Sequence, residues 1–403
     1  LGPEHGVTVG EEASQNGGAE VGGSVSVARS CRSVITMIIG EVETEIGSVR
    51  RQNRRMMPAA PQRFFASDNN AAVHPAILDA IIDVNHGHTV AYGDDPVTRR
   101  TERLFDEIFG RPVNTFFVWN GTGANVTALA CALPPAGAVI CTSCAHIHVD
   151  ETGAPERFLG AKLLDLPHVE GKLDGALVHE AARDIGIVHH VQPSVVSITQ
   201  STEWGTVYSV DEIGVICDIA HGYGMTVHVD GARISNAVAA VGGGVDTLRT
   251  MLVETGVDMV SFGGTKNGMM YGEAVVFLNP DLARRAGYVR KQTTQLPSKV
   301  RYIAAQFSAM FSNDLWLTTA RHANAKSLEL YNKVKDVPGL QVSPPRVNSL
   351  YPKLAASVRE PLREWSFFYD WDPRAGQVRW MTSWDTTSED IDTFCAGLEI
   401  LSR

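Results

Sequence analysis

The sequence predicts an α/β fold: a mainly parallel sheet with helices on both faces, followed by a small C-terminal α+β domain. Two observations carry this prediction. From Phe64 onward, short apolar β-branched runs alternate with helical patterns, which is typical of βαβ units. The candidate polar groups follow the carboxyl ends of these runs, which is the edge where open parallel sheets bind ligands.

The elements are expected in the following order. Strands rich in Val, Ile and Phe are predicted at 115–119, 138–141, 195–199, 225–229, 257–262 and 273–278, with helices at 124–133 and from 211 to about 221. After about Ser308 the pattern changes to a long helix over 313–334, a strand over 377–381 and a closing helix from Ser388. We therefore expect a disordered extension over 1–60, a large ligand-binding domain over 61–307 and a small domain over 308–403.

Composition excludes several classes of protein. The 403 residues are 44% hydrophobic and carry a net charge of −10, which argues against nucleic acid as a main partner. No apolar stretch approaches the roughly 20 residues of a membrane span. Six cysteines at irregular spacings indicate a reducing compartment and hence a cytoplasmic location. The pair Cys141 and Cys144 is weak evidence for either a redox or a zinc site, so no metal is expected.

The N-terminal extension allows a second location. Residues 28–57 are rich in Arg, as a mitochondrial transit peptide would be. Three acidic residues, Glu41, Glu43 and Glu45, count against that interpretation. A dispensable extension is the favoured alternative.

One lysine and one aspartate provide the strongest chemical signal. Lys266 follows the expected strand 257–262 across two glycines, and Asp230 ends the strand 225–229. A carboxylate and an amine at the ends of buried strands are how a protein can hold pyridoxal phosphate (PLP), with the lysine forming a Schiff base and the aspartate pairing with the pyridine nitrogen. A lysine alone at such a place is usually a solvated surface residue.

Further groups follow neighbouring strands. Gly121 and Thr122 begin the helix after the first strand, where N–H groups can hold a phosphate, although a simple tight turn explains the same residues. His146 follows the next strand and could stack on a pyridine ring or be structural. Ala232 is small enough to lie beneath a flat ring, and Arg233 can reach the ring hydroxyl or a carboxylate. Because an arginine within an apolar strand requires a partner, Arg379 predicts either a grip on the α-carboxylate of an amino acid or an internal salt bridge.

Together these residues lie in strings that resemble the threonine aldolase family of PLP enzymes, in its bacterial low-specificity and phenylserine-cleaving branch. The resemblance runs from Phe65 to near the C-terminus. The matching strings are Ser67-Asp68-Asn69, Tyr92-Gly93-Asp94-Asp95, Asn120-Gly121-Thr122, Ala145-His146, the segment 150–156, Ser197-Ile198-Thr199-Gln200, and the segments 228–233 and 261–268.

The resemblance implies a fold-type I PLP enzyme, a homodimer or homotetramer with active sites at subunit interfaces. The cofactor would be held by Lys266, Asp230, Gly121, Thr122, His146, Ala232 and Arg233. The substrate carboxylate would be bound by Ser67, Arg233 and Arg379. His189 matches a second active-site histidine, although His190 leaves the register open. Lys299 is expected to reach the phosphate from the partner subunit.

The expected reaction is retro-aldol cleavage of a β-hydroxy-α-amino acid, such as threonine, allo-threonine or phenylserine, to glycine and an aldehyde. His146 is the first candidate for the base that removes the β-hydroxyl proton, and His189 is the second. The competing hypotheses are another fold-type I enzyme, either an aminotransferase or a β-eliminating lyase, and a PLP-fold protein without catalysis. The last would require loss of Lys266 or Asp230, and both are present.

Overall fold

The computed structural model describes residues 57–402. The chain divides into two units, Leu1–Met57 and Pro58–Arg403, and the second contains every element described below. Nearly all of the predicted extension over 1–60, including its arginine-rich part up to residue 56, lies outside the described residues.

The larger sheet has seven strands in the order β1-β7-β6-β5-β4-β2-β3. They are β1 (Asn114–Val118), β2 (Gly137–Thr142), β3 (Lys162–Leu166), β4 (Gln192–Thr199), β5 (Thr226–Gly231), β6 (Met259–Phe262) and β7 (Glu273–Phe277). β7 is antiparallel to both of its neighbours, and the other neighbouring pairs are parallel. The prediction of a mainly parallel α/β sheet is confirmed. β3 was not predicted, because only one of its five residues is fully buried and its apolar signal is weak.

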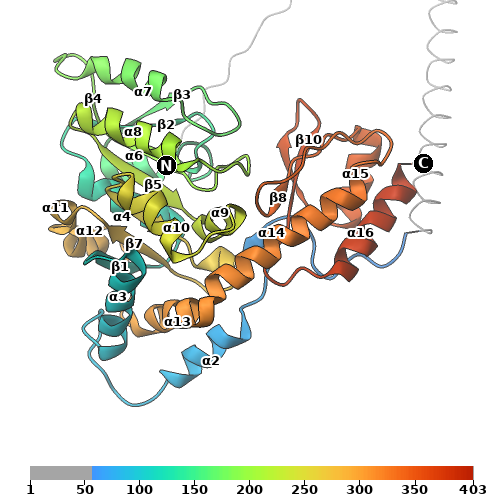
Figure 1. Ribbon diagram of the computed structural model, residues 1–403, viewed down its shortest axis with the longest axis horizontal. Coiled ribbons are helices and arrows are strands. Elements are labelled where there is room, and N and C mark those ends of the chain that lie inside the picture. The colour runs from blue at the N-terminus through green and yellow to red at the C-terminus, as the bar shows by residue number, and fades with distance from the viewer. Residues whose placement is uncertain (1–56, 403) are drawn as a thin grey trace, which may run out of the picture. The chain divides into compact units, whose positions relative to one another are not determined.

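Helices cover both faces of this sheet (Figure 1). They are α2 (Pro75–Asp83), α3 (Pro96–Phe109), α4 (Gly121–Ala132), α5 (His146–Val149), α6 (Ala154–Leu159), α7 (Gly175–Ala181), α8 (Val210–Gly222), α9 (Ile234–Ala240), α10 (Val245–Arg249), α11 (Pro280–Ala283), α12 (Ala286–Gln292) and α13 (Arg301–Phe311), with a π-helix, η3 (Thr250–Glu254), after α10. α8 begins with a capping box between Ser209 and Glu212, a local signal that fixes the start of a helix.

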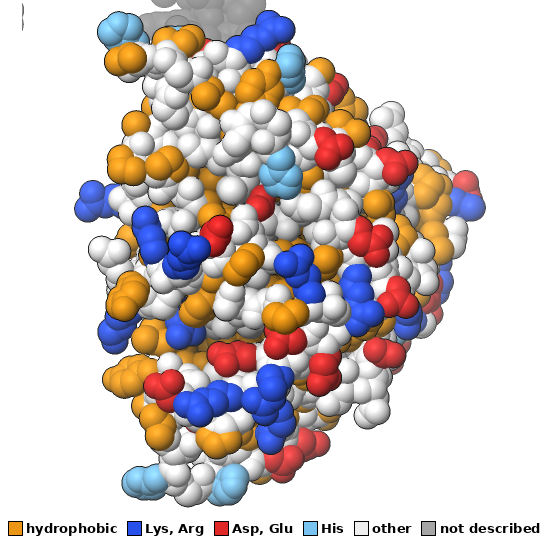
Figure 2. All heavy atoms as spheres, turned by 60° about the vertical axis from the view of Figure 1, so that its left-hand side comes forward, with side chains coloured by type: hydrophobic (Ala, Val, Ile, Leu, Met, Phe, Trp, Pro, Cys, Tyr) orange, Lys and Arg blue, Asp and Glu red, His pale blue; other side chains and the backbone are white. Residues whose placement is uncertain are grey.

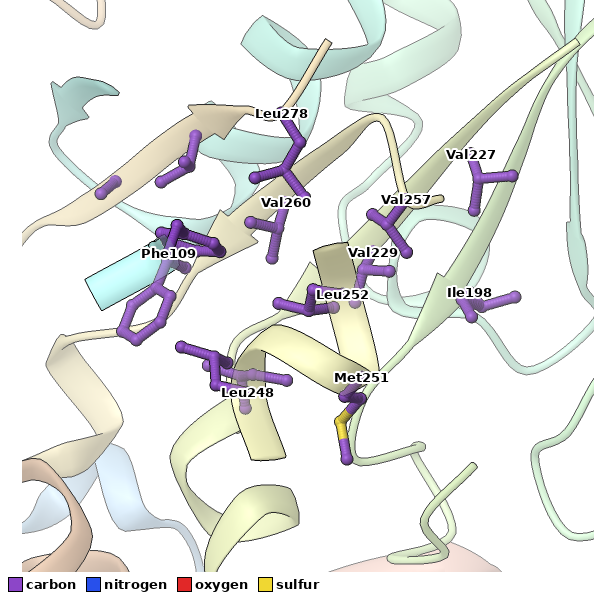
Figure 3. Close-up of a cluster of buried hydrophobic side chains, with 14 of the residues drawn as sticks. Phe109, Ile198, Val227, Val229, Leu248, Met251, Leu252, Val257, Val260 and Leu278 are labelled. Carbon is purple, nitrogen blue, oxygen red and sulfur yellow. The ribbon is translucent and has the colours of Figure 1, made fainter. Parts of the chain in front are cut away.

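The two faces of β5 differ, and this difference positions the site. Val227 and Val229 point into the main core, and Figure 3 shows Val229 beside Leu252 of η3. Successive side chains of a strand alternate between faces, so His228 and Asp230 point to the opposite face, toward α4. That face therefore becomes polar as the strand reaches its carboxyl end.

The C-terminal part contains a three-stranded antiparallel sheet in the order β8-β10-β9, formed by β8 (Ser349–Leu350), β9 (Tyr369–Asp372) and β10 (Gln377–Met381). Three helices accompany it: α14 (Leu315–Val334), α15 (Ala356–Trp365) and α16 (Ser388–Leu401). The predicted strand over 377–381 and closing helix are confirmed. The predicted domain boundary between 307 and 308 falls within α13 and stays a prediction.

The long helix α14 links the two cores. Its first turn carries Trp316 and Leu317, which belong to the core below the large sheet. Its last turns carry Leu330 and Val334, which pack in the C-terminal core with Phe65. Figure 1 shows α14 running from α13 toward α15 and α16.

The surface is mixed in charge. On the face drawn in Figure 2, acidic and basic side chains are interspersed with apolar ones. Within residues 57–402, no helix is both long and apolar enough to cross a membrane.

Candidate active site

Two glycines place Lys266 beside the end of β5. A Cβ on Gly263 would lie 2.2 Å from the carbonyl oxygen of Ala232, and a Cβ on Gly264 would lie 2.4 Å from the sulfur of Met269. The chain can therefore turn tightly here only because both residues lack a side chain. The turn continues into a short 3-10 helix, η4 (Thr265–Asn267), which carries the half-buried Lys266. Burial, with the charge of Arg233, lowers the pKa of the Lys266 amine.

Asp230 is buried at the end of β5 and is held by two neutral donors. Its Oδ1 accepts the N–H of Ala232 at 3.0 Å, and its Oδ2 accepts the side-chain amide of Asn125 at 2.8 Å. Burial alone would raise the pKa of this carboxyl, but the charges of His146 and Lys266 outweigh burial and lower it. A buried carboxylate held by neutral donors fits a cationic partner such as a protonated pyridine nitrogen.

His146 opens α5, and its ring Nδ1 lies 2.8 Å from Oε1 of Glu151. The same oxygen of Glu151 accepts the amide of Asn125 at 2.9 Å, so one amide joins the histidine's partner to Asp230. Burial would lower the pKa of His146, but the Glu151 hydrogen bond and the Asp230 charge raise it. The structure thus brings His146 and Asp230 into one hydrogen-bonded network.

Next to this network on β5, a buried histidine hydrogen-bonds to both neighbouring strands. His228 contacts the hydroxyl of Ser197 on β4 through Nδ1 and that of Ser261 on β6 through Nε2, each at 2.9 Å. Burial lowers the pKa of His228 to about 4, so the ring is neutral near pH 7. The three side chains form a polar layer beneath Asp230 that the sequence analysis did not identify as such.

The phosphate cup predicted at Gly121 and Thr122 is the start of α4. Asn120 caps this helix: its side chain accepts the N–H of Gly123 at 2.8 Å. Within the described chain, no hydrogen bond uses the amides of Gly121 and Thr122, as expected of a helix start. Gln295, missed by the sequence analysis, lies against this turn, because a Cβ on Gly123 would come within 2.1 Å of its carboxamide.

The two predicted carboxylate-binding arginines differ in their partners. Arg233 forms a two-pronged ion pair with Asp68, with distances of 2.7 Å from Nε to Oδ2 and 2.9 Å from Nη2 to Oδ1. Both side chains are largely buried. Its charge is therefore balanced within the chain, and only part of its guanidinium is left for a ligand. Asp68 was not singled out as a site residue, although it lies in the string Ser67-Asp68-Asn69.

Arg379 has no such partner. It lies on β10, donates to the carbonyl oxygen of Ala66 at 3.3 Å, and stacks over the rings of Tyr369 and Trp371 at 5.8 and 5.3 Å. Its Nε is buried without a hydrogen bond, and no carboxylate of residues 57–402 forms an ion pair with it. Burial, together with the charge of Arg233, lowers its pKa. Of the two alternatives predicted for Arg379, the internal salt bridge is absent from the described residues.

Residues 66–68 contact both arginines and include Ser67, the third residue predicted to bind the carboxylate. Ala66 accepts from Arg379, and Asp68 binds Arg233. Ser67 therefore lies between these contacts, with its hydroxyl accepting the N–H of Asn69 at 3.2 Å. The three predicted carboxylate-binding residues are brought to one place.

His189 and Lys299 are not brought to this group. His189 is exposed in the turn before β4, at the amino end of the sheet. Lys299 is exposed and lines an open hollow of about 580 Å³ with Trp119, Tyr271 and Tyr302. Their predicted roles are not tested by a single chain and stay predictions.

A second carboxylate touches His146 and was also missed. Oε1 of Glu203 accepts the backbone N–H of His146 at 2.9 Å and the hydroxyl of Thr199 at 2.7 Å. Its Oε2 is buried without a partner in the described chain, and burial raises the pKa of this carboxyl. Glu203 lies only four residues after the end of β4, so its place at a strand's carboxyl end was the available signal.

These residues fit PLP by the chemistry of their side chains. One amine, one buried carboxylate held by neutral donors and one helix start lie at the same edge of the sheet. Buried atoms without partners in the described chain, Oδ1 of Asn125 and Oε2 of Glu151, lie beside them. Cys141 is buried and Cys144 half-buried, both as free thiols, and residues 57–402 contain no cluster of His, Cys, Asp and Glu suited to a metal ion.

Comparison with known proteins agrees with this geometry. A family model described as beta-eliminating lyase matches residues 65–357. A low specificity L-threonine aldolase of Pseudomonas aeruginosa is 41% identical over 84% of this chain and 97% of its own length. The solved threonine aldolase of Leishmania major is 30% identical, with a TM-score of 0.79 over 86% of this chain and 100% of its own. An aspartate aminotransferase of Rhodobacter sphaeroides shares the fold alone, with 18% identity and a TM-score of 0.60 over 86% of this chain and 91% of its own.

Proposed function

This chain belongs to the threonine aldolase family of PLP-dependent lyases, and from that premise we propose that it cleaves β-hydroxy-α-amino acids to glycine and an aldehyde. Threonine, allo-threonine and phenylserine are the substrates to test. Such a reaction takes part in threonine breakdown and in glycine formation. The cytoplasmic location expected from composition remains part of the proposal.

The observation that carries the proposal is Arg379, which forms no ion pair within residues 57–402 and contacts Ala66, two residues before the Asp68 that binds Arg233. A largely buried guanidinium without a carboxylate partner is costly, and the α-carboxylate of an amino acid supplies the missing charge in a bidentate geometry. The carbonyl of Ala66 and the rings of Tyr369 and Trp371 fix the guanidinium in place. The site therefore fits an amino acid.

Different residues of the chain would bind different parts of the cofactor. Lys266 would carry the cofactor through its aldehyde, Asp230 would pair with the pyridine nitrogen, and the amides of Gly121 and Thr122 would hold the phosphate. When bound, PLP accepts the electron pair of the bond that breaks. The charge of Asp230 favours the protonated pyridine, which strengthens that acceptance.

Other side chains act on the substrate. Arg379 and Ser67 bind the carboxylate and so orient the Cα–Cβ bond for cleavage. His146 takes the proton of the β-hydroxyl, a contribution of roughly 10²–10⁴-fold for a general base. The Cα–Cβ bond breaks, the aldehyde leaves, and Cα gains a proton to give glycine.

Replacing the lysine tests the proposal. Lys266→Ala should remove the visible absorbance of the lysine-bound cofactor and lower cleavage of threonine by at least ~10³-fold, as loss of a covalent group does. Aldehyde release and absorbance measure these effects, and circular dichroism shows whether the variant is folded. Wild-type cleavage by this variant would end the proposal.

A second candidate follows from the matching family model, which is named for beta-eliminating lyases. Elimination would give ammonia and a keto acid, whereas retro-aldol cleavage gives glycine and an aldehyde. One assay of both product pairs with threonine and phenylserine separates the two reactions. We expect glycine and aldehyde in equal amounts.

We also propose that the active form is a homodimer or homotetramer in which Lys299 acts in a neighbouring subunit's site. Lys299 is exposed and lies in an open hollow beside the exposed Trp119. Co-expression of Lys266→Ala with Lys299→Ala should restore cleavage, because one site of each mixed dimer keeps both lysines.

Mass spectrometry shows whether mixed dimers of the two variants form. If they form and cleavage is not restored, Lys299 does not act in a neighbouring subunit. Light scattering during size-exclusion chromatography measures the number of subunits. A monomer with full activity would reject the proposed assembly but not the reaction.

A further inference from the structure

A continuous chain of hydrogen bonds joins the catalytic histidine to the aspartate that binds the cofactor. The ring Nδ1 of His146 lies 2.8 Å from Oε1 of Glu151, and the Nδ2 of Asn125 lies 2.9 Å from that oxygen and 2.8 Å from Oδ2 of Asp230. The two N–H bonds of one amide thus serve two carboxylates. Ala232 holds the other oxygen of Asp230 through its backbone N–H.

The burial of Glu151 requires an explanation. Its side chain is 0% exposed, and its Oε2 has no hydrogen-bond partner among the described residues. A buried carboxylate is costly unless its interactions compensate for lost hydration. The only side chains bonded to it within residues 57–402 are His146 and Asn125.

The chemistry of a carboxylate determines which ring nitrogen carries the proton. An ionised carboxylate only accepts hydrogen bonds, so Nδ1 of His146 must carry hydrogen when it contacts Glu151. In the neutral ring, Nε2 is then the atom with the free electron pair. A histidine that is to accept the β-hydroxyl proton needs this tautomer.

We propose that Glu151 is a positioning residue that holds His146 in the tautomer with Nε2 free for the substrate hydroxyl, and that Asn125 couples this histidine to Asp230. The proposal rests on the proposed function, in which His146 is the base and Asp230 binds the cofactor. Neither Glu151 nor Asn125 needs to touch the substrate. Both act through the orientation and charge of their neighbours.

Four charged or titratable groups act on His146. Glu151 and Asp230 favour the protonated ring, and Lys266 opposes it. Glu203 contacts only the backbone N–H of His146. Replacing Glu151 with glutamine removes one favourable charge and offers Nδ1 either a donor or an acceptor, so both the tautomer and the titration of the ring should change.

Nuclear magnetic resonance of ¹⁵N-labelled histidine tests the proposal in the apoprotein and in the cofactor-loaded enzyme. The signal of His146 is assigned by its loss in His146→Asn. In the wild type, the neutral ring should be protonated at Nδ1. In Glu151→Gln, the Nε2-protonated form should appear and the titration midpoint should fall, while Glu151→Asp, which keeps the charge, should retain more of the wild-type behaviour.

The matched control is Asp281→Asn. Asp281 pairs with Arg284 at 2.6 Å on the surface, so this variant removes a carboxylate from an ion pair elsewhere. It should leave the His146 signal and cleavage unchanged. Glu151→Gln should lower kcat at least ~10-fold, part of what a general base supplies, and move the acidic limb of the pH profile of kcat to lower pH.

An unchanged tautomer and midpoint in folded Glu151→Gln would overturn the proposal, whatever the activity. If Glu151→Gln does not fold, the same measurement on Asn125→Ser decides, because loss of the amide should alter the His146 titration without removing Glu151. A wild-type protein that shows the expected tautomer but does not cleave β-hydroxy amino acids would contradict the proposed function and leave the positioning role of Glu151 intact.

Discussion

The two ends of the central sheet carry the same kind of residue pair with different surroundings. At the amino end, His221 Nε2 lies 2.9 Å from Oδ2 of Asp258, and that carboxylate also accepts the N–H of Val227 and the amide of Asn279, each at 2.8 Å. Each oxygen of Asp258 therefore has a partner. This pair ties β5, β6 and the end of β7 together and is structural.

At the carboxyl end, the pair of His146 and Glu151 leaves buried atoms without partners. Oε2 of Glu151 and Oδ1 of Asn125 have no hydrogen bond within the described chain, and Asp230 has only neutral donors in hydrogen bonds. The difference shows that a carboxylate–histidine pair alone does not identify a site. At the carboxyl end, the atoms without partners belong to groups beside Lys266 and Asp230, where a bound ligand can supply the missing hydrogen bonds.

The largest effect is expected from Arg379, which lies on β10 and binds the segment that carries Ser67 and Asp68. Arg379→Ala should lower kcat/KM for threonine by about 10²–10³-fold, mainly through KM, because a buried charge-assisted contact is lost. Steady-state kinetics measure this effect. Arg321→Ala is the control, since Arg321 is exposed on α14. An equal loss in both variants would remove Arg379 from the substrate site.

Asp258 tests the amino end. Asp258→Asn should lower the free energy of unfolding by about 1–3 kcal/mol, because a buried donor loses its acceptor, while kcat at a temperature below the transition changes little. Urea unfolding and kinetics on the same preparation measure both. A large loss of kcat with unchanged stability would contradict the structural assignment of this pair.

The pH dependence of stability distinguishes the carboxyl-end pair. Because the folded state raises the pKa of His146, the pair contributes its full stabilisation below the ordinary histidine pKa of about 6.5 and loses it as pH rises through the folded value. The difference in unfolding free energy between wild-type and Glu151→Gln apoprotein should therefore shrink as pH rises above the ordinary histidine pKa of about 6.5. A difference that grows over this range would have the wrong sign.

The smallest effect is expected for an exposed pair at the amino end, Asp184 with His190 at 3.1 Å. Asp184→Asn should change stability by less than about 0.5 kcal/mol, because exposed ion pairs contribute little. Thermal unfolding measures this change. A destabilisation above about 1 kcal/mol would show that an exposed carboxylate–histidine pair in this protein can also contribute substantially to stability.

The residues that sequence could predict are those whose chemistry is visible next to a strand. Lys266, Asp230 and His146 each follow an apolar run, and the fold places all three at the sheet's carboxyl edge. β-branched runs also predicted six of the seven strands of the large sheet, whereas the edge strand β3 exposes too much of its surface to produce that signal.

The partners of those residues could not be predicted, because they come from distant parts of the chain. Asn125 lies 105 residues from Asp230, and Asp68 lies 165 residues from Arg233. An asparagine inside a helix or an aspartate at the start of a short 3-10 helix has no local feature that distinguishes it. Only the packing of α4 against the sheet, and of the segment around Asp68 against β10, gives them their roles.

The C-terminal core has a consequence for how the protein is made. Phe65 packs edge-on against Phe394 at 4.8 Å, and Arg63 binds Asp390 across 327 residues of chain. During synthesis, Arg63 and Phe65 cannot make these contacts until α16 has left the ribosome. Such long-range contacts slow folding. Lys266 and Asp230 also precede Arg379 in the chain and are translated before it. A chain that ends before β10 would therefore contain these two cofactor-binding residues but lack Arg379.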